Sequence, residues 1–159
     1  EPLMSRIVTV TGDAVQNPCN FEVPVGMLLS ELLEQAGGLK NEASKIICGG
    51  PMMGKALFIM EVPVTKTTSA LTCLTEDEVS ALAPSACINC GRCVEACPSR
   101  LIPSRLADYA EHHDEEKFTK HEGLECMECG SCSFVCPAKR PLMQLFKQTK
   151  AEIMAAKRR

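Results

Sequence analysis

The sequence contains one cysteine spacing twice. Each copy has the form Cys-x2-Cys-x2-Cys-x3-Cys-Pro. The first copy comprises Cys87, Cys90, Cys93 and Cys97, and the second comprises Cys126, Cys129, Cys132 and Cys136. This spacing is typical of bacterial proteins that hold [4Fe–4S] clusters, in which the fourth cysteine of each run ligates the other cluster. Two complete runs therefore predict two [4Fe–4S] clusters and one-electron chemistry.

The crossing rule assigns a ligand set to each cluster. Cluster 1 is predicted to take Cys87, Cys90, Cys93 and Cys136, and cluster 2 to take Cys126, Cys129, Cys132 and Cys97. Each cluster would draw on both copies, so we expect this part of the fold to depend on the metal. Gly91 and Gly130 follow the second cysteine of each copy. Because glycine has no Cβ, it would let the backbone approach the cluster closely.

Two other interpretations of the cysteines fit less well. Structural zinc sites place their Cys-x2-Cys pairs roughly 12 or more residues apart. Disulfides need an oxidising compartment, and the chain has no signal-peptide pattern and an odd total of 11 cysteines. The remaining Cys19, Cys48 and Cys73 lie singly in apolar stretches, so we predict that they are small buried hydrophobes.

Composition excludes several classes of function. The formal net charge is −3 and the aromatic residues are one Tyr, five Phe and no Trp, which does not suit nucleic-acid binding. No run of about 18 apolar residues is present, so we expect no membrane span, and the cysteine usage favours the reducing cytoplasm. Because the chain begins at Glu1 rather than Met, we expect it to be part of a longer protein.

Residues 1–74 are predicted to form a small mixed domain. Apolar alternation predicts strands, and a leucine stripe followed by Gly37-Gly38 predicts a helix with a glycine C-cap. The expected strands are 7–11, 21–25, 46–47, 56–62 and 67–74, and the expected helix is 28–36. This order indicates an α+β sheet with one helix across it, a β-grasp arrangement. The loop 49–54 is predicted to be a tight turn with two partly buried methionines.

Residues 75–84 are predicted to be a linker helix and residues 85–159 a helix-rich cluster domain. Thr75 and Glu78 have the spacing of a capping box, and Pro84 would end the helix. The segment between Cys97 and Cys126 is long enough for two helices, one of them over 102–113. We expect His113 to lie at the end of that helix rather than to ligate metal. A last amphipathic helix should start at Pro141.

The order of these modules resembles a known family. A β-grasp domain carrying Gly-Gly-Pro-Met-Met-Gly (49–54) precedes Cys-Ile-Asn-Cys-Gly-Arg-Cys-Val-Glu-Ala-Cys-Pro (87–98) and Cys-Met-Glu-Cys-Gly-Ser-Cys-Ser-Phe-Val-Cys-Pro (126–137). The chain is similar over essentially its whole length to the C subunit of the Rnf electron-transport complex, whose β-grasp part is a soluble-ligand-binding β-grasp (SLBB) domain. All eight motif cysteines match cluster ligands of that family.

The resemblance implies a role in a membrane-associated ferredoxin:NAD oxidoreductase coupled to ion translocation. The family's FMN- and NAD(H)-binding part precedes the β-grasp domain, so the chain would be an electron carrier peripheral to the cytoplasmic side of the bacterial membrane. Its partners would be other subunits of the complex, and no catalytic side chain is assigned. A related cobalamin reductase is an alternative. A small-ligand-binding module is another, although residues 5–74 show no polar cluster that would form a pocket.

Overall fold

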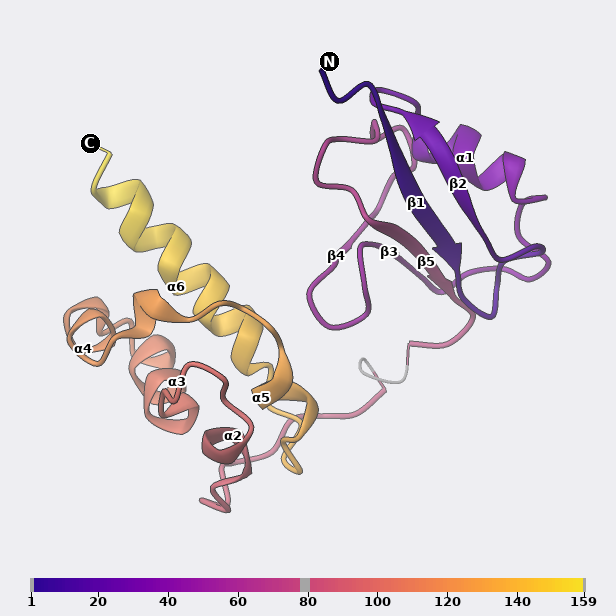
Figure 1. Ribbon diagram of the computed structural model, residues 1–159. Coiled ribbons are helices and arrows are strands. Elements are labelled where there is room, and N and C mark those ends of the chain that lie inside the picture. The colour runs from indigo at the N-terminus through magenta and orange to yellow at the C-terminus, as the bar shows by residue number, and fades with distance from the viewer. Residues whose placement is uncertain (1, 78–80, 159) are drawn as a thin grey trace. The chain divides into compact units, whose positions relative to one another are not determined.

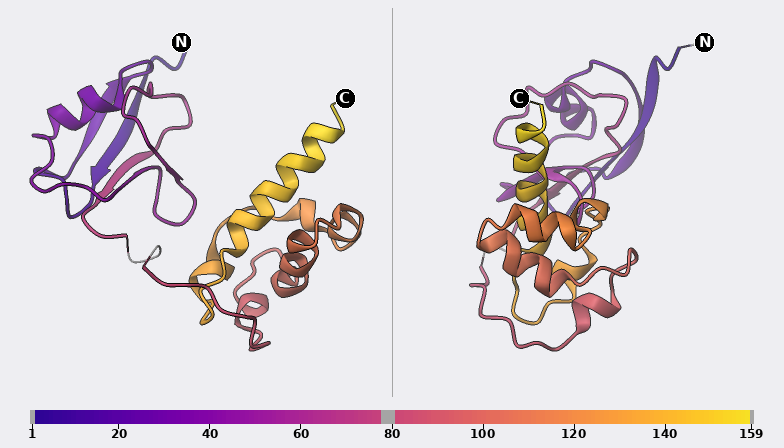
Figure 2. Two further views of the ribbon diagram at one scale, coloured as in Figure 1. Left: turned by 180° about the vertical axis from the view of Figure 1, so that it is seen from behind. Right: turned by 90° about the vertical axis from the view of Figure 1, so that its left-hand side faces the viewer.

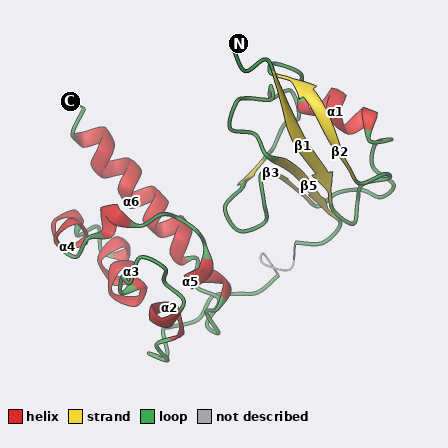
Figure 3. Ribbon diagram, in the orientation of Figure 1, coloured by secondary structure: helices red, strands yellow, loops and turns green. Residues whose placement is uncertain are grey.

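The computed structural model describes residues 2–77 and 81–158. Contacts between residues divide the chain into two compact units, residues 1–81 and residues 82–159. The described strands all belong to the first unit, and five of the six described α-helices belong to the second (Figure 3). This confirms an α+β domain followed by a helix-rich domain.

The first unit is a five-stranded mixed sheet. Its strands are β1 (Ser5–Thr11), β2 (Cys19–Pro24), β3 (Lys45–Cys48), β4 (Lys55–Ala56) and β5 (Ala70–Leu74). They lie in the order β2-β1-β5-β3-β4, in which β1 and β5 run parallel and the other pairs antiparallel. The parallel pair at the centre brings together the first and last strands, which is the β-grasp arrangement predicted from the sequence.

One face of this sheet is covered by helix α1 (Leu29–Gln35), as Figure 1 shows. Val8 and Val10 of β1 are fully buried while the neighbouring Ile7 is exposed, because successive side chains of a strand point to opposite faces. Leu29 and Leu32 of α1 are also fully buried. The helix ends just before Gly37-Gly38, as predicted.

The segment after β4 differs from the prediction. A strand was expected over 56–62, but pairing ends at Ala56. The carbonyl oxygens of Met60 and Val62 instead accept hydrogen bonds from the backbone N–H groups of Ser30 and Leu29, at 3.2 and 3.0 Å. These N–H groups belong to the first turn of α1, where a helix offers them no partner of its own. The segment therefore caps the helix rather than joining the sheet.

The linker helix over 75–84 stays a prediction, because residues 78–80 lie outside the described part of the chain. The described residues on either side of this gap are not helical. The backbone N–H of Thr75 donates to Asp13 Oδ1 at 3.0 Å and its hydroxyl donates to Asp13 Oδ2. Thr75 is therefore tied to the turn after β1, and the boundaries 1–74, 75–84 and 85–159 remain a proposal.

One side-chain prediction in the first unit is wrong in part. Cys73 on the central strand β5 is fully buried as expected, but Cys48 is only partly buried and Cys19, on the edge strand β2, is exposed. An edge strand offers fewer neighbours than the apolar sequence around Cys19 suggested. Met52 and Met53 are 39% and 55% exposed, in keeping with the predicted partly buried methionines.

The second unit consists of helices around one apolar core. They are α2 (Arg92–Glu95), α3 (Pro103–Glu111), α4 (Glu115–Lys120), the 3-10 helix η1 (Gly123–Glu125), α5 (Ser131–Phe134) and α6 (Leu142–Ala156). α3 and α6 pack side by side, as Figures 1 and 2 show. Phe118 and Phe146 meet in the core with their ring centroids 6.0 Å apart. The two helices predicted between Cys97 and Cys126 are therefore confirmed as α3 and α4.

Candidate metal centres

The two cysteine copies have the same backbone conformation. Positive φ angles occur at three matching positions in or just after each copy. The pairs are Asn89 and Glu128 (54° and 56°), Gly91 and Gly130 (78° and 79°), and Arg100 and Lys139 (54° and 53°). Non-glycine residues seldom adopt positive φ, so the two matched non-glycine pairs indicate that both loops fold in the same constrained way.

This conformation suits an anionic group. Residues that alternate between left-handed and other conformations turn successive N–H groups toward one concavity, which binds anions and iron–sulfur clusters. A Cβ added to Gly91 would meet nothing within 4 Å, so the positive φ, and not crowding within the protein, is what requires glycine there. The structure thus gives Gly91 a conformational role beside the close approach expected from the sequence.

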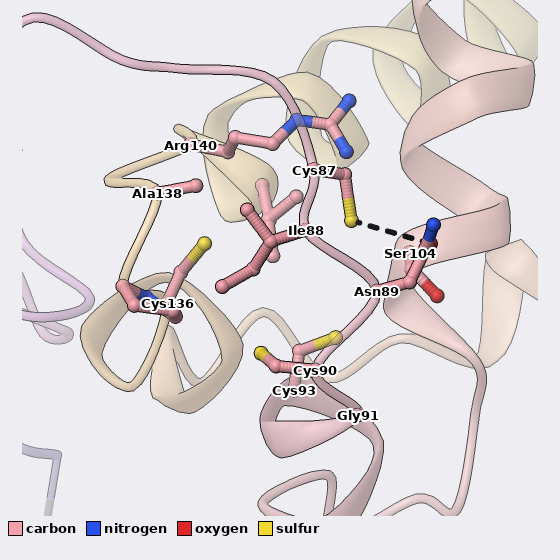
Figure 4. Close-up of a pocket in the computed structure, with 12 residues that line it drawn as sticks. Cys87, Ile88, Asn89, Cys90, Gly91, Cys93, Ser104, Cys136, Ala138 and Arg140 are labelled. Atoms are coloured by element: carbon pink, nitrogen blue, oxygen red, sulfur yellow. Dashed lines mark hydrogen bonds between the residues drawn. The ribbon is translucent and has the colours of Figure 1, made fainter.

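The fold groups the eight motif cysteines into two sets. Site 1 is the hollow lined by Cys87, Cys90, Cys93 and Cys136, shown in Figure 4. Site 2 is a second hollow lined by Cys97, Cys126, Cys129 and Cys132. α2 and α5 contact each other, and this contact brings the fourth cysteine of each copy to the hollow formed by the other copy. Each hollow therefore contains three cysteines of one copy and one of the other.

The arrangement fits a cluster better than a single ion. A zinc ion holds its thiolates at about 2.3 Å, so its ligands must converge on one point. Among the described residues, no three His, Cys, Asp or Glu side chains converge closely enough to hold one metal ion. The cysteines instead line the walls of hollows, and thiolates in that position suit the corners of an iron–sulfur cluster. His113 lines neither hollow and follows His112, the C-cap residue of α3.

Site 1 is open and carries a cation. Cys87 and Cys90 are exposed. The guanidinium of Arg140 lies beside Cys87 (Figure 4). It also forms an ion pair with Glu111 at 2.6 Å. Cys87 Sγ lies 3.7 Å from Asn89 Oδ1. Arg140, which follows shortly after the Cys-Pro of the second copy, was not predicted from the sequence.

Site 2 is more enclosed. Its walls include the buried side chains of Leu101, Leu106 and Phe146. Glu128 is also among the residues of this hollow, and Lys150 Nζ lies 2.9 Å from its carboxylate. Lys150 further donates to the backbone carbonyl of Cys126 at 2.7 Å. The charged groups near this site therefore form a pair.

Burial affects the thiols unequally. It raises the pKa of Cys132 to about 11 and also raises the pKa of Cys93 and of Cys126 above the usual range. The hydroxyl of Ser131, 3.5 Å from Cys129 Sγ, lowers the pKa of that thiol. Metal binding needs thiolates, so loading these sites must release protons.

The first unit contains a polar hollow that the sequence analysis did not find. Asp13, Lys45, Thr75 and Asp77 line it. Lys45 Nζ lies 2.8 Å from Asp77 Oδ2, and the Thr75 hydroxyl lowers the pKa of Asp13. Tertiary folding brings these residues together from distant parts of the sequence. Because they pair with one another, their polar groups are engaged within the protein rather than directed at a ligand.

No helix in the described parts of the chain, residues 2–77 and 81–158, is long and apolar enough to cross a membrane. Two family models match the chain. Residues 7–56 match the SLBB domain, and residues 86–140 match the 4Fe-4S dicluster domain. The second match contains all eight motif cysteines, which supports iron–sulfur clusters as the cofactors of this unit.

Curated proteins match nearly the whole chain. The C subunit of the Na(+)-translocating ferredoxin:NAD(+) oxidoreductase complex of Acetobacterium woodii is 42% identical over 99% of the chain and 36% of its own length. The C subunits of the ion-translocating oxidoreductase complexes of Yersinia enterocolitica and Pasteurella multocida are each 41% identical over 96% of the chain, and 22% and 18% of their own lengths. The chain thus spans about a third or less of these relatives. By its two domains and these similarities, it belongs to the family of C subunits of Rnf-type electron-transport complexes.

Proposed function

We propose that the chain is the electron-transfer segment of an Rnf-type complex and relays single electrons through two [4Fe–4S] clusters. The observation that carries the proposal is the crossed grouping of the eight cysteines around two hollows of one folded unit. In this proposal Cys87, Cys90, Cys93 and Cys136 hold cluster 1, and Cys126, Cys129, Cys132 and Cys97 hold cluster 2. Each bound cluster would supply a one-electron donor and acceptor.

The chain's own residues position and tune these groups. The left-handed loops would turn backbone N–H groups toward a bound cluster, and the contact between α2 and α5 keeps the two sites close. Burial and hydrogen bonds to sulfur then adjust the reduction potentials. No side chain is assigned as an acid, base or nucleophile, because electron transfer requires none.

The remaining parts of the proposal rest on the relatives. The Acetobacterium protein is a subunit of a complex named for Na⁺ translocation, ferredoxin and NAD⁺. We infer that this chain acts with other subunits of such a complex, peripheral to the cytoplasmic side of the membrane. FMN and NAD(H) would bind outside these 159 residues, so the chain alone would carry electrons without oxidising NADH.

Anaerobic iron and sulfide analysis, combined with low-temperature EPR after dithionite reduction, tests this function. The proposal expects about eight irons and eight sulfides per chain and two interacting S = 1/2 centres. Cys129→Ala should remove the signal of one cluster and lower the iron content. Cys19→Ala is the matched control, since Cys19 is an exposed cysteine of the other unit.

Three results would contradict the proposal. Zinc in place of iron in anaerobically prepared protein would make the cysteines structural. A full complement of iron in Cys129→Ala would refute the ligand assignment. Rapid reduction of cob(III)alamin by the loaded chain, without a membrane partner, would favour the alternative of a cobalamin reductase. Equilibrium dialysis with cobalamin checks the small-ligand alternative for the first unit, and we expect no binding.

A further inference from the structure

The two candidate cluster sites differ in charge although they come from the same repeat. Arg140 in the second copy corresponds to Leu101 in the first, since each is the fourth residue after the last cysteine of its copy. Arg140 lines site 1, whereas Leu101 lines site 2. The repeat therefore places a cation at one set of sulfurs and an aliphatic side chain at the other.

At site 1 the positive charge lies beside a ligand sulfur. The Arg140 side chain is only 11% exposed, and its guanidinium lies next to Cys87 (Figure 4). Its counter-ion Glu111, on α3, is 41% exposed and does not line the hollow. The cation of this pair therefore lies at site 1, and the anion is its more exposed partner.

At site 2 the nearby cation is not directed at a sulfur. Lys150 binds the carboxylate of Glu128, a residue of this hollow, and donates to the backbone oxygen of Cys126. The charge of Lys150 is thus compensated by a carboxylate at the same site, and Leu101 adds no charge there. The net positive field at these sulfurs is therefore weaker than at site 1.

Reduction adds one negative charge to a cluster. Net charge, hydrogen bonds to the sulfurs and solvent exposure set cluster potentials. A cation beside a ligand sulfur and two exposed ligands, Cys87 and Cys90, stabilise the reduced state at site 1. An apolar wall and the buried Cys132 destabilise it at site 2. We propose that Arg140 is a tuning residue that makes the cluster of site 1 the one of higher potential, so that an electron shared by the pair rests there.

This inference depends on the proposed function, since it requires both clusters. Its test is a potentiometric EPR titration of the anaerobically loaded wild-type chain and of the variants Arg140→Gln and Glu111→Gln. Arg140→Gln should lower the midpoint potential of the higher-potential cluster by at least about 59 mV, which corresponds to a tenfold change in its one-electron reduction equilibrium. Glu111→Gln should raise the same midpoint, because it leaves Arg140 without its counter-ion. The other cluster should shift much less in both variants.

The opposite signs separate tuning from structure. Both variants break the same ion pair, so a purely structural role of that pair would move both midpoints in one direction. Lys139→Gln is the matched control: it removes an equal charge from the adjacent residue, which is less buried, and should leave both midpoints close to wild type. Arg140→Lys, which keeps the charge, should lie between wild type and Arg140→Gln.

Defined results would overturn the inference. These are a shift confined to the lower-potential cluster, shifts of the same sign in Arg140→Gln and Glu111→Gln, or no shift beyond that of Lys139→Gln. If Arg140→Gln does not retain iron, the upward shift in Glu111→Gln decides the question. A wild-type chain without two clusters would refute the proposed function itself, whereas a wild-type chain with two clusters and no such shifts would refute only the role of Arg140.

Discussion

Replacing Gly91 with alanine should weaken the hold of the chain on cluster 1. Gly91 has a φ of 78°, in the left-handed region, and an added Cβ would have no atom within 4 Å. Sterically the change is free, so its whole cost is the conformational one, about 1–2 kcal/mol for an L-residue in this region. A cost of that size changes an equilibrium by roughly 5- to 30-fold.

The assay is the rate of iron release from the anaerobically loaded chain to an excess of chelator. If the loop relaxes on release, Gly91→Ala should lose iron from one cluster about 5- to 30-fold faster than wild type. Gly91→Asn should be affected less, because Asn tolerates the left-handed region better. Gly50→Ala is the matched control: its added Cβ also has open space, but its φ is not positive. Equal rates for Gly91→Ala and Gly50→Ala would refute the argument from φ.

Three further predictions follow from the two units. Phe118 is fully buried against Phe146, so Phe118→Ala should destabilise the second unit by about 3–5 kcal/mol in denaturant unfolding. Phe134 is exposed, so Phe134→Ala should cost less than about 0.5 kcal/mol. Similar losses in the two variants would contradict the assignment of Phe118 to the core. Burial raises the pKa of Cys73 from 9.0 to about 11, so its contribution to stability is complete below pH 9.0 and is lost as the pH rises through about 11. Thermal unfolding from pH 8 to 11 should therefore show a steeper decline for wild type than for Cys73→Ala, and parallel curves would argue against a buried neutral thiol. Removal of iron by chelation should abolish amide protection in α3 and α6 and preserve it in β1 and β5, as measured by hydrogen exchange; loss of protection in both units would show that they do not fold separately.

Much of the fold was predictable because its signals are local. The β-branched run 7–11 and the alternation over 21–25 predicted β1 and β2, and the leucine stripe before Gly37-Gly38 predicted α1 with its end. These patterns depend only on the period of a strand or helix and on glycine at a helix end. The same holds for the last helix, which begins at Leu142 next to the predicted Pro141.

The wrong or incomplete predictions concern partners that are distant in sequence. Residues 57–62 have the pattern of a strand, but carbonyl groups among them satisfy the N–H groups at the start of α1, in a segment well before them in the chain. Cys19 lies in an apolar stretch, yet the sheet order puts it on an edge strand. The position of a strand within a sheet is decided by all the strands together, and no local pattern encodes it.

The cysteine repeat by itself determined the class of cofactor and the number of clusters expected, because cluster binding needs thiolates at fixed short spacings along one loop. Only the tertiary structure decided what surrounds each site. Arg140 lies beside Cys87 because the contact between α2 and α5 and the ion pair with α3 bring separate segments together. Electrostatic fields act through space and not along the chain, so the difference between two nearly identical motifs became visible only once the chain was folded.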